Sequence, residues 1–330
     1  MTWRGRRVLV TGADGFIGSH LTEALVMAGA TVRVFCFYNS NSSLGWLDEV
    51  SPDVRGALDV RLGDIRDARF VEEACRDVEV AFHLAALVAI PYSYLAPDSF
   101  VDTNVLGTLH VLEGVRRQGV ARMVHTSTSE VYGTPDALPI TEGHPLKGQS
   151  PYSATKIAAD KLCEAFHCSF DTPVVILRPF NTYGPRQSAR AVIPTILGQL
   201  LSGRREVALG NLTPQRDLTY VADTVRGFLA AGETTGIEGR TIQLGTGRAE
   251  SIGDLFVAAC RACGVAARAL EQKERVRPAS SEVMVLQSDP RLARELLGWR
   301  ADVSLEEGLA RTIAWMRQHL HHFHPETNAI

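Results

Sequence analysis

The 330-residue sequence has no long apolar run, no extended basic cluster and little net charge. No apolar stretch reaches the ~20 residues that a transmembrane helix needs, so we expect no membrane-spanning segment. The formal net charge is −3, which argues against a surface that binds nucleic acid. The first residues pass from Arg4–Arg7 straight into a predicted strand, unlike a signal peptide. We therefore expect a cytoplasmic protein.

Cysteine is scarce, and the sequence has no internal repeat or low-complexity segment. The six cysteines are scattered, and Cys260 and Cys263 form an isolated pair without a second pair of suitable spacing. This pattern favours reduced thiols over a zinc site. The histidines of His319–His324 are irregularly spaced and have no acids in ligand register, so we interpret them as a solvated helix end. No metal is expected.

Glycine, in contrast, is arranged in a pattern near the start of the chain. Gly12, Gly15 and Gly18 follow the apolar strand Arg7–Thr11 and open a helix with an apolar stripe. The first glycine permits a tight turn, the second lets a pyrophosphate approach the backbone, and the third lets helix and strand pack closely. The free N–H groups of the helix start favour phosphate. This strand–turn–helix context predicts dinucleotide binding.

The second predicted strand, Thr31–Phe37, ends without the acid that binds the adenosine ribose in such folds. Cys36 stands at that place, and Asn39 and Ser40 follow as possible donors to a 2′-phosphate. Since no Arg or Lys accompanies these two side chains, both NAD and NADP stay open as cofactors.

Further apolar strands are predicted at 60–65, 78–84, 120–126 and 174–177, with helices at 99–118 and 151–168. Their alternation favours an α/β fold with a Rossmann-like, doubly wound parallel sheet over residues 1–178. Asp64 ends one of these strands, and its carboxylate is suited to contact the edge of an adenine base. Ala85 and Ala86 follow the next strand, where small residues let a cofactor lie against the backbone.

The stretch from Val124 to Lys156 has the residues of a catalytic centre. Thr128 and Glu130 follow a predicted strand at its carboxyl end, where open α/β sheets bind ligands. Tyr152 and Lys156 are four residues apart, so they share one helix face. An ammonium near a phenol favours phenolate, which makes Tyr152 a candidate general base.

After Arg178 the pattern changes to turn-rich segments and shorter helices, which predicts a smaller mixed α/β lobe over residues 179–330. This division leaves open a crossing of the chain between the two lobes. The loops of the smaller lobe contain a set of amide and cationic side chains that suit a second diphosphate, separate from the cofactor: Asn181, Arg186, Arg190, Arg216 and Arg277.

Together these motifs resemble the extended short-chain dehydrogenase/reductase family, and within it the nucleotide-sugar epimerases and dehydratases. The resemblance runs from Val8 to about Arg317. The Thr128-Ser129-Glu130 motif and the stretch Glu282–Asp289 resemble nucleotide-sugar 4,6-dehydratases, both of the GDP-mannose type and of legionaminic-acid pathways. This resemblance implies a nucleotide-sugar substrate, a tightly bound and recycled cofactor, and a homodimer.

The resemblance also implies the residues of each site. The cofactor would contact Gly12, Asp14, Gly15, Phe16, Ile17, Gly18, Asn39, Ser40, Asp64, Ile65, Leu84, Ala85, Ala86, Asn104, Tyr152 and Lys156. Catalysis would use Thr128, Ser129, Glu130, Tyr152 and Lys156, and the substrate would contact Val88 together with the amide and cationic set of the second lobe.

By this resemblance Tyr152 takes the proton of the sugar 4-hydroxyl, Glu130 removes the C5 proton, and the 6-hydroxyl leaves as water with help from Ser129 or Glu130. Two alternatives share the same motifs. A 4-epimerase needs only Thr128 and Tyr152. A UDP-glucuronate decarboxylase needs a cation for the carboxylate, a part that Arg186 or Arg190 can take.

Overall fold

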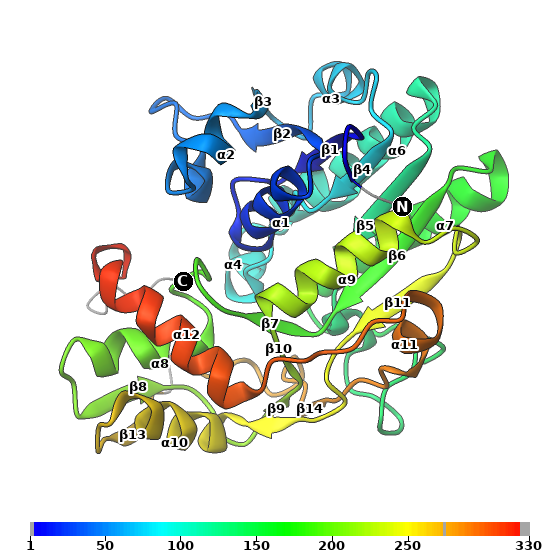
Figure 1. The fold of residues 1–330 in the computed structure, drawn as a ribbon. Helices are drawn as coiled ribbons and strands as arrows, with labels where there is room; N and C mark the ends of the chain where they lie inside the picture. Colours follow the sequence, from blue (N-terminus) through cyan, green and yellow to red (C-terminus); the bar gives the residue numbers. More distant parts are fainter. Residues whose placement is uncertain (1–2, 273–274, 324–330) are drawn as a thin grey trace.

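The computed structural model describes residues 3–272 and 275–323. Its centre is a seven-stranded sheet in the order β11-β6-β5-β4-β1-β2-β3, in which every neighbouring pair is parallel (Figure 1). The strands are β1 (Arg7–Thr11), β2 (Thr31–Phe37), β3 (Leu58–Gly63), β4 (Val80–His83), β5 (Arg122–Thr126), β6 (Val174–Pro179) and β11 (Thr241–Leu244). The predicted doubly wound α/β fold is confirmed.

Helices cover both faces of this sheet, which explains its nearly unbroken apolar strands. Alternate residues of β1 enter different cores: Val8 and Val10 pack on one face and Leu9 on the other. The first face carries α1 (Phe16–Met27) and α9 (Val221–Glu233), which pack together. The second carries α3 (Ala68–Ala74), α6 (Gly107–Gln118) and α7 (Pro151–Phe170). We call the sheet with these helices the sheet lobe.

The remaining part, here the small lobe, lies below the sheet lobe in Figure 1 and contains short strands and helices. Its strand pairs are β7 (Asn181–Tyr183) with β10 (Leu218–Tyr220), and β8 (Glu206–Leu209) with β13 (Arg268–Glu271). A third sheet has the order β12 (Glu250–Ser251), β9 (Gln215–Arg216), β14 (Val285–Leu286). Its helices are α8 (Val192–Leu201), α10 (Ile252–Cys263) and α12 (Leu305–Gln318), whereas α11 (Arg291–Leu297) packs on α9 and β11 of the sheet lobe.

The chain does not divide once at residue 178. After entering the small lobe it returns to the sheet lobe, where α9 packs on α1 and β11 pairs with β6. The sheet therefore includes a strand from the predicted second lobe, and the two lobes are joined by several crossings of the chain.

The predicted helix at 99–118 is interrupted. The structure has α5 (Pro97–Phe100), a π-helical segment η2 (Val101–Leu106) and then α6. Because a π turn contains an extra residue, it rotates the following helix face. In this segment the apolar Val101 is exposed, while the polar Asn104 is buried.

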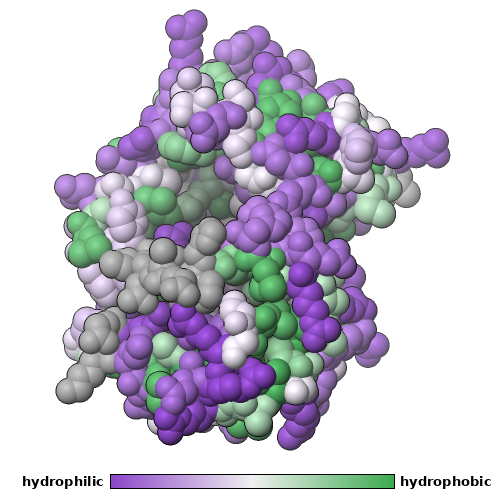
Figure 2. Space-filling view, turned by 90° about the vertical axis from the view of Figure 1, so that its left-hand side faces the viewer, coloured by the Kyte–Doolittle hydropathy of each residue, from purple (hydrophilic) through white to green (hydrophobic). Residues whose placement is uncertain are grey.

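The other short elements are connectors: α2 (Pro52–Gly56), α4 (Ile90–Leu95), and the 3₁₀ turns η1 (Gly45–Asp48), η3 (Ser129–Tyr132) and η5 (Leu320–His322). Figure 2 shows a recess between the upper part of the molecule, which is the sheet lobe, and the lower part. None of the helices in the described residues is long and apolar enough to cross a bilayer.

Candidate functional site

The glycine turn between β1 and α1 is built for close backbone approach. Gly12 has φ +68°, and a Cβ there would lie 2.7 Å from the backbone nitrogen of Ala85. A Cβ on Gly18 would lie 2.1 Å from the Gly12 carbonyl oxygen. Gly15 caps α1 without a side-chain hydrogen bond, so the first helical N–H groups are open to a ligand. These features fit the pyrophosphate of a dinucleotide.

Two buried polar side chains shape the loop that follows β4. The Thr11 hydroxyl accepts hydrogen bonds from the backbone nitrogens of Leu84 and Ala85, each at 3.2 Å, and bonds His83 Nδ1 at 2.8 Å. Asn104 bonds the Leu87 backbone nitrogen and oxygen at 2.8 and 3.0 Å. Asn104, predicted as a cofactor ligand, is thus placed as a support for the loop 84–87. Sequence reasoning missed Thr11.

The ends of β2 and β3 lie next to each other, but their polar groups have partners within the protein. Asn39 donates to the carbonyls of Phe37 and Ser43 and accepts from the backbone nitrogens of Asn41 and Ser43. Its amide therefore holds its own loop and is not free for a 2′-phosphate. The predicted adenine-edge carboxylate has a partner as well: Asp64 pairs with Arg66 at 2.6 Å. Ser40 is exposed, and Ile65 is buried beneath the β3 end.

Asp14, also predicted at the cofactor site, lies between the glycine turn and the β2 end. Its carboxylate accepts from the Phe37 backbone nitrogen at 3.2 Å, and its carbonyl accepts from Trp46 of η1 at 3.0 Å. Burial raises the pKa of Asp14, against the hydrogen bond from Phe37. Asp14 therefore fixes the segment that would cover the adenosine side of a dinucleotide.

The candidate catalytic residues lie after the end of β5 (Arg122–Thr126) and at the start of α7 (Pro151–Phe170). Thr128 caps η3, and its Oγ1 accepts from the Glu130 backbone nitrogen at 3.2 Å. The Thr128 side chain lowers the pKa of the Tyr152 phenol, against the effect of burial, and Tyr152 is nearly fully buried. Pro151 stands in the first turn of α7 as predicted, and Ser150 and Ser153 form a capping box that fixes this helix start. The structure thus brings Thr128, Glu130 and Tyr152 together, with Ser129 buried beside them.

Lys156 behaves differently from the sequence expectation. Its Nζ donates to the Thr126 carbonyl oxygen at 2.6 Å. Burial raises the pKa of Tyr152, with the hydrogen bond to Thr128 opposing this, and Lys156 is not among the groups that act on the phenol. Burial also lowers the pKa of Lys156, against the pull of Asp160. The expected easier ionisation of Tyr152 is therefore absent here, because desolvation of the phenol outweighs any nearby positive charge.

A buried charge network lies behind this centre, and sequence reasoning missed it. Asp160, fully buried, accepts from Ser127 Oγ at 2.8 Å and from Arg178 Nη2 and Nε at 2.9 and 3.1 Å. Arg178 also donates to the Tyr132 hydroxyl at 3.0 Å. Hydrogen bonding to His125 and the charge of Arg178 lower the pKa of Asp160 against desolvation. The available signal was the spacing of Lys156 and Asp160, which are one helical turn apart.

Two arginines predicted for the substrate converge on the catalytic turn. Arg216 Nη2 donates to Glu282 Oε1 at 3.0 Å, and Arg216 Nη1 donates to the Val283 carbonyl at 2.8 Å. Arg277 Nη1 lies 3.9 Å from Glu130 Oε1 and 3.8 Å from Glu282 Oε1, and it is buried without a hydrogen bond among the described residues. Glu130, Arg216, Arg277 and Glu282 therefore form one cluster. Glu282 was not predicted as a site residue.

The other predicted substrate residues lie differently. Arg186 has φ +67° and pairs with Glu23 of α1, with Ser19 Oγ 3.3 Å away, so it links the small lobe to the sheet lobe. Asn181 Oδ1 is buried and accepts no hydrogen bond among the described residues. Arg190 is exposed and bonds Ser188 Oγ at 3.3 Å. Val88 is an exposed apolar side chain.

A short chain of hydrogen bonds also connects the two lobes near this cluster. The Tyr94 hydroxyl of α4 bonds Ser281 Oγ at 2.6 Å, and Ser281 Oγ donates to the Gln149 carbonyl at 2.7 Å. Gln149 Nε2 donates to the Ser280 carbonyl at 3.0 Å. These bonds place residues 280–282 against both α4 and the loop that precedes Tyr152.

Comparison with known proteins identifies this arrangement. The family model described as GDP-mannose 4,6 dehydratase matches residues 9–312. The chain belongs to the extended short-chain dehydrogenase/reductase family of nucleotide-sugar epimerases and dehydratases. Relatives of both activities are similar to it. A dTDP-glucose 4,6-dehydratase of Streptomyces griseus is 35% identical over 314 residues, 94% of each chain. A UDP-glucose 4-epimerase of Mycolicibacterium smegmatis is 34% identical over 316 residues, 94% of this chain and 98% of the relative.

Solved structures of this family share the whole fold. A dTDP-glucose 4,6-dehydratase from Streptomyces venezuelae with NAD bound superposes with a TM-score of 0.84 at 31% identity, covering 97% of this chain and 100% of the other. The predicted family is confirmed. The relatives include both lyases and isomerases, so the activity must be argued from the residues of this chain.

Proposed function

We propose that this protein is a nucleotide-sugar 4,6-dehydratase, which converts an NDP-hexose or NDP-N-acetylhexosamine to the 4-keto-6-deoxy sugar. One observation carries the proposal. Glu130 lies on the same short turn as Thr128, is half-buried, and is close enough to act electrostatically on the Tyr152 phenol. Elimination of water requires a second base besides the one that removes the hydroxyl proton, and Glu130 is the carboxylate in that place.

The residues at the β1–α1 turn fit NAD, which we propose as the cofactor. Gly12, Gly15 and Phe16–Gly18 would hold the pyrophosphate, and Ala85–Ala86 would lie along the dinucleotide, supported by Thr11. Because Asn39 is engaged in its own loop, the β2 end offers little to a 2′-phosphate. When bound, NAD would supply reversible hydride acceptance, so the reaction needs no external oxidant and the cofactor stays in the site.

The steps of the reaction assign one role to each side chain. Tyr152 takes the proton of the 4-hydroxyl while the C4 hydride leaves, and Thr128 positions the reacting oxygen. The resulting 4-keto group acidifies the C5 proton, which Glu130 removes. The 6-hydroxyl leaves as water after protonation by Glu130 or Ser129. A hydride then returns to C6, and C5 regains a proton, which balances the one that Tyr152 took from the 4-hydroxyl. Lys156 is proposed to bind the nicotinamide ribose.

The substrate diphosphate is proposed to bind Arg216 and Arg277, with Asn181 and Val88 lining the sugar. The supporting observation is that Arg277 Nη1 is buried and has no hydrogen bond among the described residues. Arg190 is proposed at the rim, whereas Arg186 is proposed to act through the lobe contact with Glu23.

One feature favours a 4-epimerase as the second candidate. The Glu130 carboxylate faces Arg277 at 3.9 Å. If Glu130 stays paired with Arg277 when the substrate binds, its carboxylate cannot remove the C5 proton. Thr128 and Tyr152 would then be sufficient for epimerisation at C4. The same Arg277 is a cation for a substrate carboxylate, as a UDP-glucuronate decarboxylase requires.

Mass spectrometry of the products separates the three activities. The protein as isolated would be incubated with dTDP-glucose, GDP-mannose, UDP-GlcNAc and UDP-glucuronate without added cofactor. Loss of one water from a hexose or N-acetylhexosamine donor supports the dehydratase. An unchanged mass with a new chromatographic peak means an epimerase, and loss of carbon dioxide means a decarboxylase; both results refute the proposal.

The variant Glu130→Gln tests the assigned base. We expect dehydration to fall by roughly 10²- to 10⁴-fold, the usual effect of a general acid–base group, while oxidation at C4 continues. Glu282→Gln is the matched control in the same cluster, and we expect it to raise KM more than it lowers kcat. Dehydration at the normal rate by Glu130→Gln would remove Glu130 from the mechanism.

A further inference from the structure

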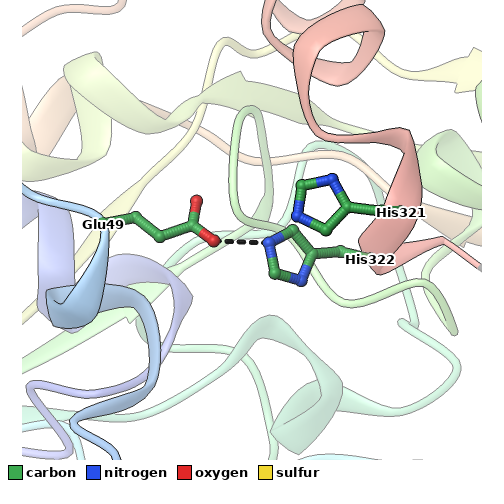
Figure 3. A group of neighbouring side chains, drawn as sticks. All are labelled: Glu49, His321 and His322. Carbon is green, nitrogen blue, oxygen red and sulfur yellow. Dashed lines mark hydrogen bonds and ion pairs between the residues drawn. The ribbon is translucent and has the colours of Figure 1, made fainter.

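A second group of side chains, away from the catalytic turn, joins the two lobes. Glu49 follows η1 in the sheet lobe, and His319, His321 and His322 lie at the end of α12 and in η5 of the small lobe. Figure 3 shows the Glu49 carboxylate pointing at the ring of His322, with the ring of His321 beside it. His324, the last histidine of the predicted solvated helix end, lies outside the described residues.

The ligand atoms of this group are close together. One atom each from Glu49, His321 and His322 lie within 4.8 Å of one another. The carboxylate hydrogen-bonds His322 through Oε1, and its Oε2 lies 3.4 Å from His319 Nε2. The rings of His321 and His322 have centroids 4.1 Å apart. Sequence spacing showed no acid in ligand register because Glu49 is 273 residues from His322.

The surrounding contacts orient these rings. His319 Nδ1 bonds the Trp315 carbonyl oxygen at 2.8 Å, which leaves its Nε2 lone pair facing Glu49. A hydrogen bond from the second ring nitrogen to a backbone carbonyl is the usual support of a metal-bound histidine. His322 packs edge-on against Trp46 of η1 at 4.9 Å between centroids. The indole of Trp315 stacks on His319 at 4.3 Å.

We propose that Glu49, His321 and His322 bind a divalent transition-metal ion of the Zn²⁺ or Ni²⁺ class, with His319 next to the fourth position. Imidazole and carboxylate ligands suit these ions, whereas Mg²⁺ and Ca²⁺ prefer oxygen ligands alone. Three protein ligands and one open position make a normal zinc coordination set. The ion would take the place of the hydrogen bond between Glu49 and His322.

Such an ion would tie the cofactor turn to the small lobe. Trp46 donates through its backbone nitrogen to the Asp14 carbonyl, so η1 is attached to the glycine turn. The histidines of the site follow α12, which packs against α8 and α10 of the small lobe. Metal binding would therefore hold the two lobes at one mutual orientation.

Calorimetric titration of the full-length, cofactor-loaded protein with Zn²⁺ tests the site. We expect one ion per chain with a micromolar or tighter Kd, and at least tenfold weaker binding in Glu49→Gln and in His321→Ala. His321→Ala keeps the Glu49–His322 hydrogen bond. Weaker Zn²⁺ binding by this variant would therefore show that His321 coordinates the ion, and not that the segment has unfolded. Asp53→Asn, an exposed acid in nearby α2, is the matched control and should bind normally.

Tryptophan fluorescence gives a second readout that is independent of activity. Because Trp46 and Trp315 contact the histidines, Ni²⁺ should quench their emission in the wild type and in Asp53→Asn, but not in Glu49→Gln. Unchanged Zn²⁺ affinity in Glu49→Gln would show chelation by the histidines alone and overturn the proposal. Absence of any binding heat or quenching would overturn it as well.

Discussion

The buried pair of Asp160 and Arg178 gives the sharpest stability prediction. Asp160 is 0% exposed and its two bonds to Arg178 measure 2.9 and 3.1 Å. Replacement of Asp160 by Asn removes the negative charge and leaves the guanidinium without a counter-charge. Breaking one side of a buried ion pair typically costs about 3–5 kcal/mol. For a chain of this length we expect the melting temperature to fall by roughly 4–7 °C.

Chemical denaturation of four proteins measures the pair itself: wild type, Asp160→Asn, Arg178→Met and the double variant. We expect the double variant to lose less than the sum of the single losses, with a coupling of about 2 kcal/mol. Glu164→Gln is the control on the same helix, because Glu164 pairs with Lys161 at the surface. It should change the free energy of unfolding by less than about 0.5 kcal/mol. A loss below about 1 kcal/mol in Asp160→Asn would refute the reasoning.

The same variant has a functional consequence. Asp160 raises the pKa of Lys156 against the lowering effect of burial. Without Asp160 the ammonium should deprotonate at lower pH, so the alkaline limb of the kcat profile should move to lower pH. A purely structural role of Asp160 would lower kcat uniformly and leave this limb in place.

Three further predictions follow from other parts of the molecule. Burial lowers the pKa of His125 from 6.5 to about 4, so the unfolded chain binds more protons between these values. The contribution of His125 to the free energy of unfolding, about 3 kcal/mol, should be complete above pH 6.5 and lost as the pH falls to 4. His125→Phe should flatten the dependence of this free energy on pH, measured by chemical denaturation at several pH values. Gly18→Ala places a Cβ 2.1 Å from a carbonyl oxygen and should cost about 1–3 kcal/mol and weaken NAD binding in calorimetry, whereas Gly56→Ala meets no atom within 4 Å and should do neither. Leu106 is 42% exposed, as are the apolar Val101 of η2 and Leu95 of α4, and we propose that this face forms the expected homodimer; Leu106→Lys should then give a monomer in light scattering, and an unchanged dimer mass would refute the assignment of this face.

Sequence patterns predicted those parts of the site that are formed by a single continuous segment of the chain. The strand bounds Arg7–Thr11 and Thr31–Phe37 agree with β1 and β2. The glycine turn and the spacing of Tyr152 and Lys156 were also readable, because helical geometry places residues four apart on one face. These features depend on neighbours in sequence, and composition and periodicity contain that information.

Side-chain partners between distant segments were not predictable in the same way. Glu282 pairs with Arg216 across 66 residues, and Arg186 reaches Glu23 across 163 residues. A single sequence gives the charge of each group but not the strand order that brings it to a partner. The pKa of Tyr152 was misjudged for the same reason: spacing showed the nearby ammonium, whereas burial, which depends on the whole fold, decides the shift.

On the proposed mechanism, the choice between elimination and epimerisation depends on the contacts between the two lobes. Thr128 and Tyr152 both belong to the sheet lobe, at the start of η3 and of α7, so their relative position does not depend on the small lobe. Glu130 is different, because its nearest cation, Arg277, belongs to the small lobe. Residues 280 and 281 next to Arg277 are held by Tyr94 and Gln149. On the proposed mechanism, these contacts between the lobes would decide whether Glu130 pairs with Arg277 or acts as the second base, and with it the choice between epimerisation and elimination.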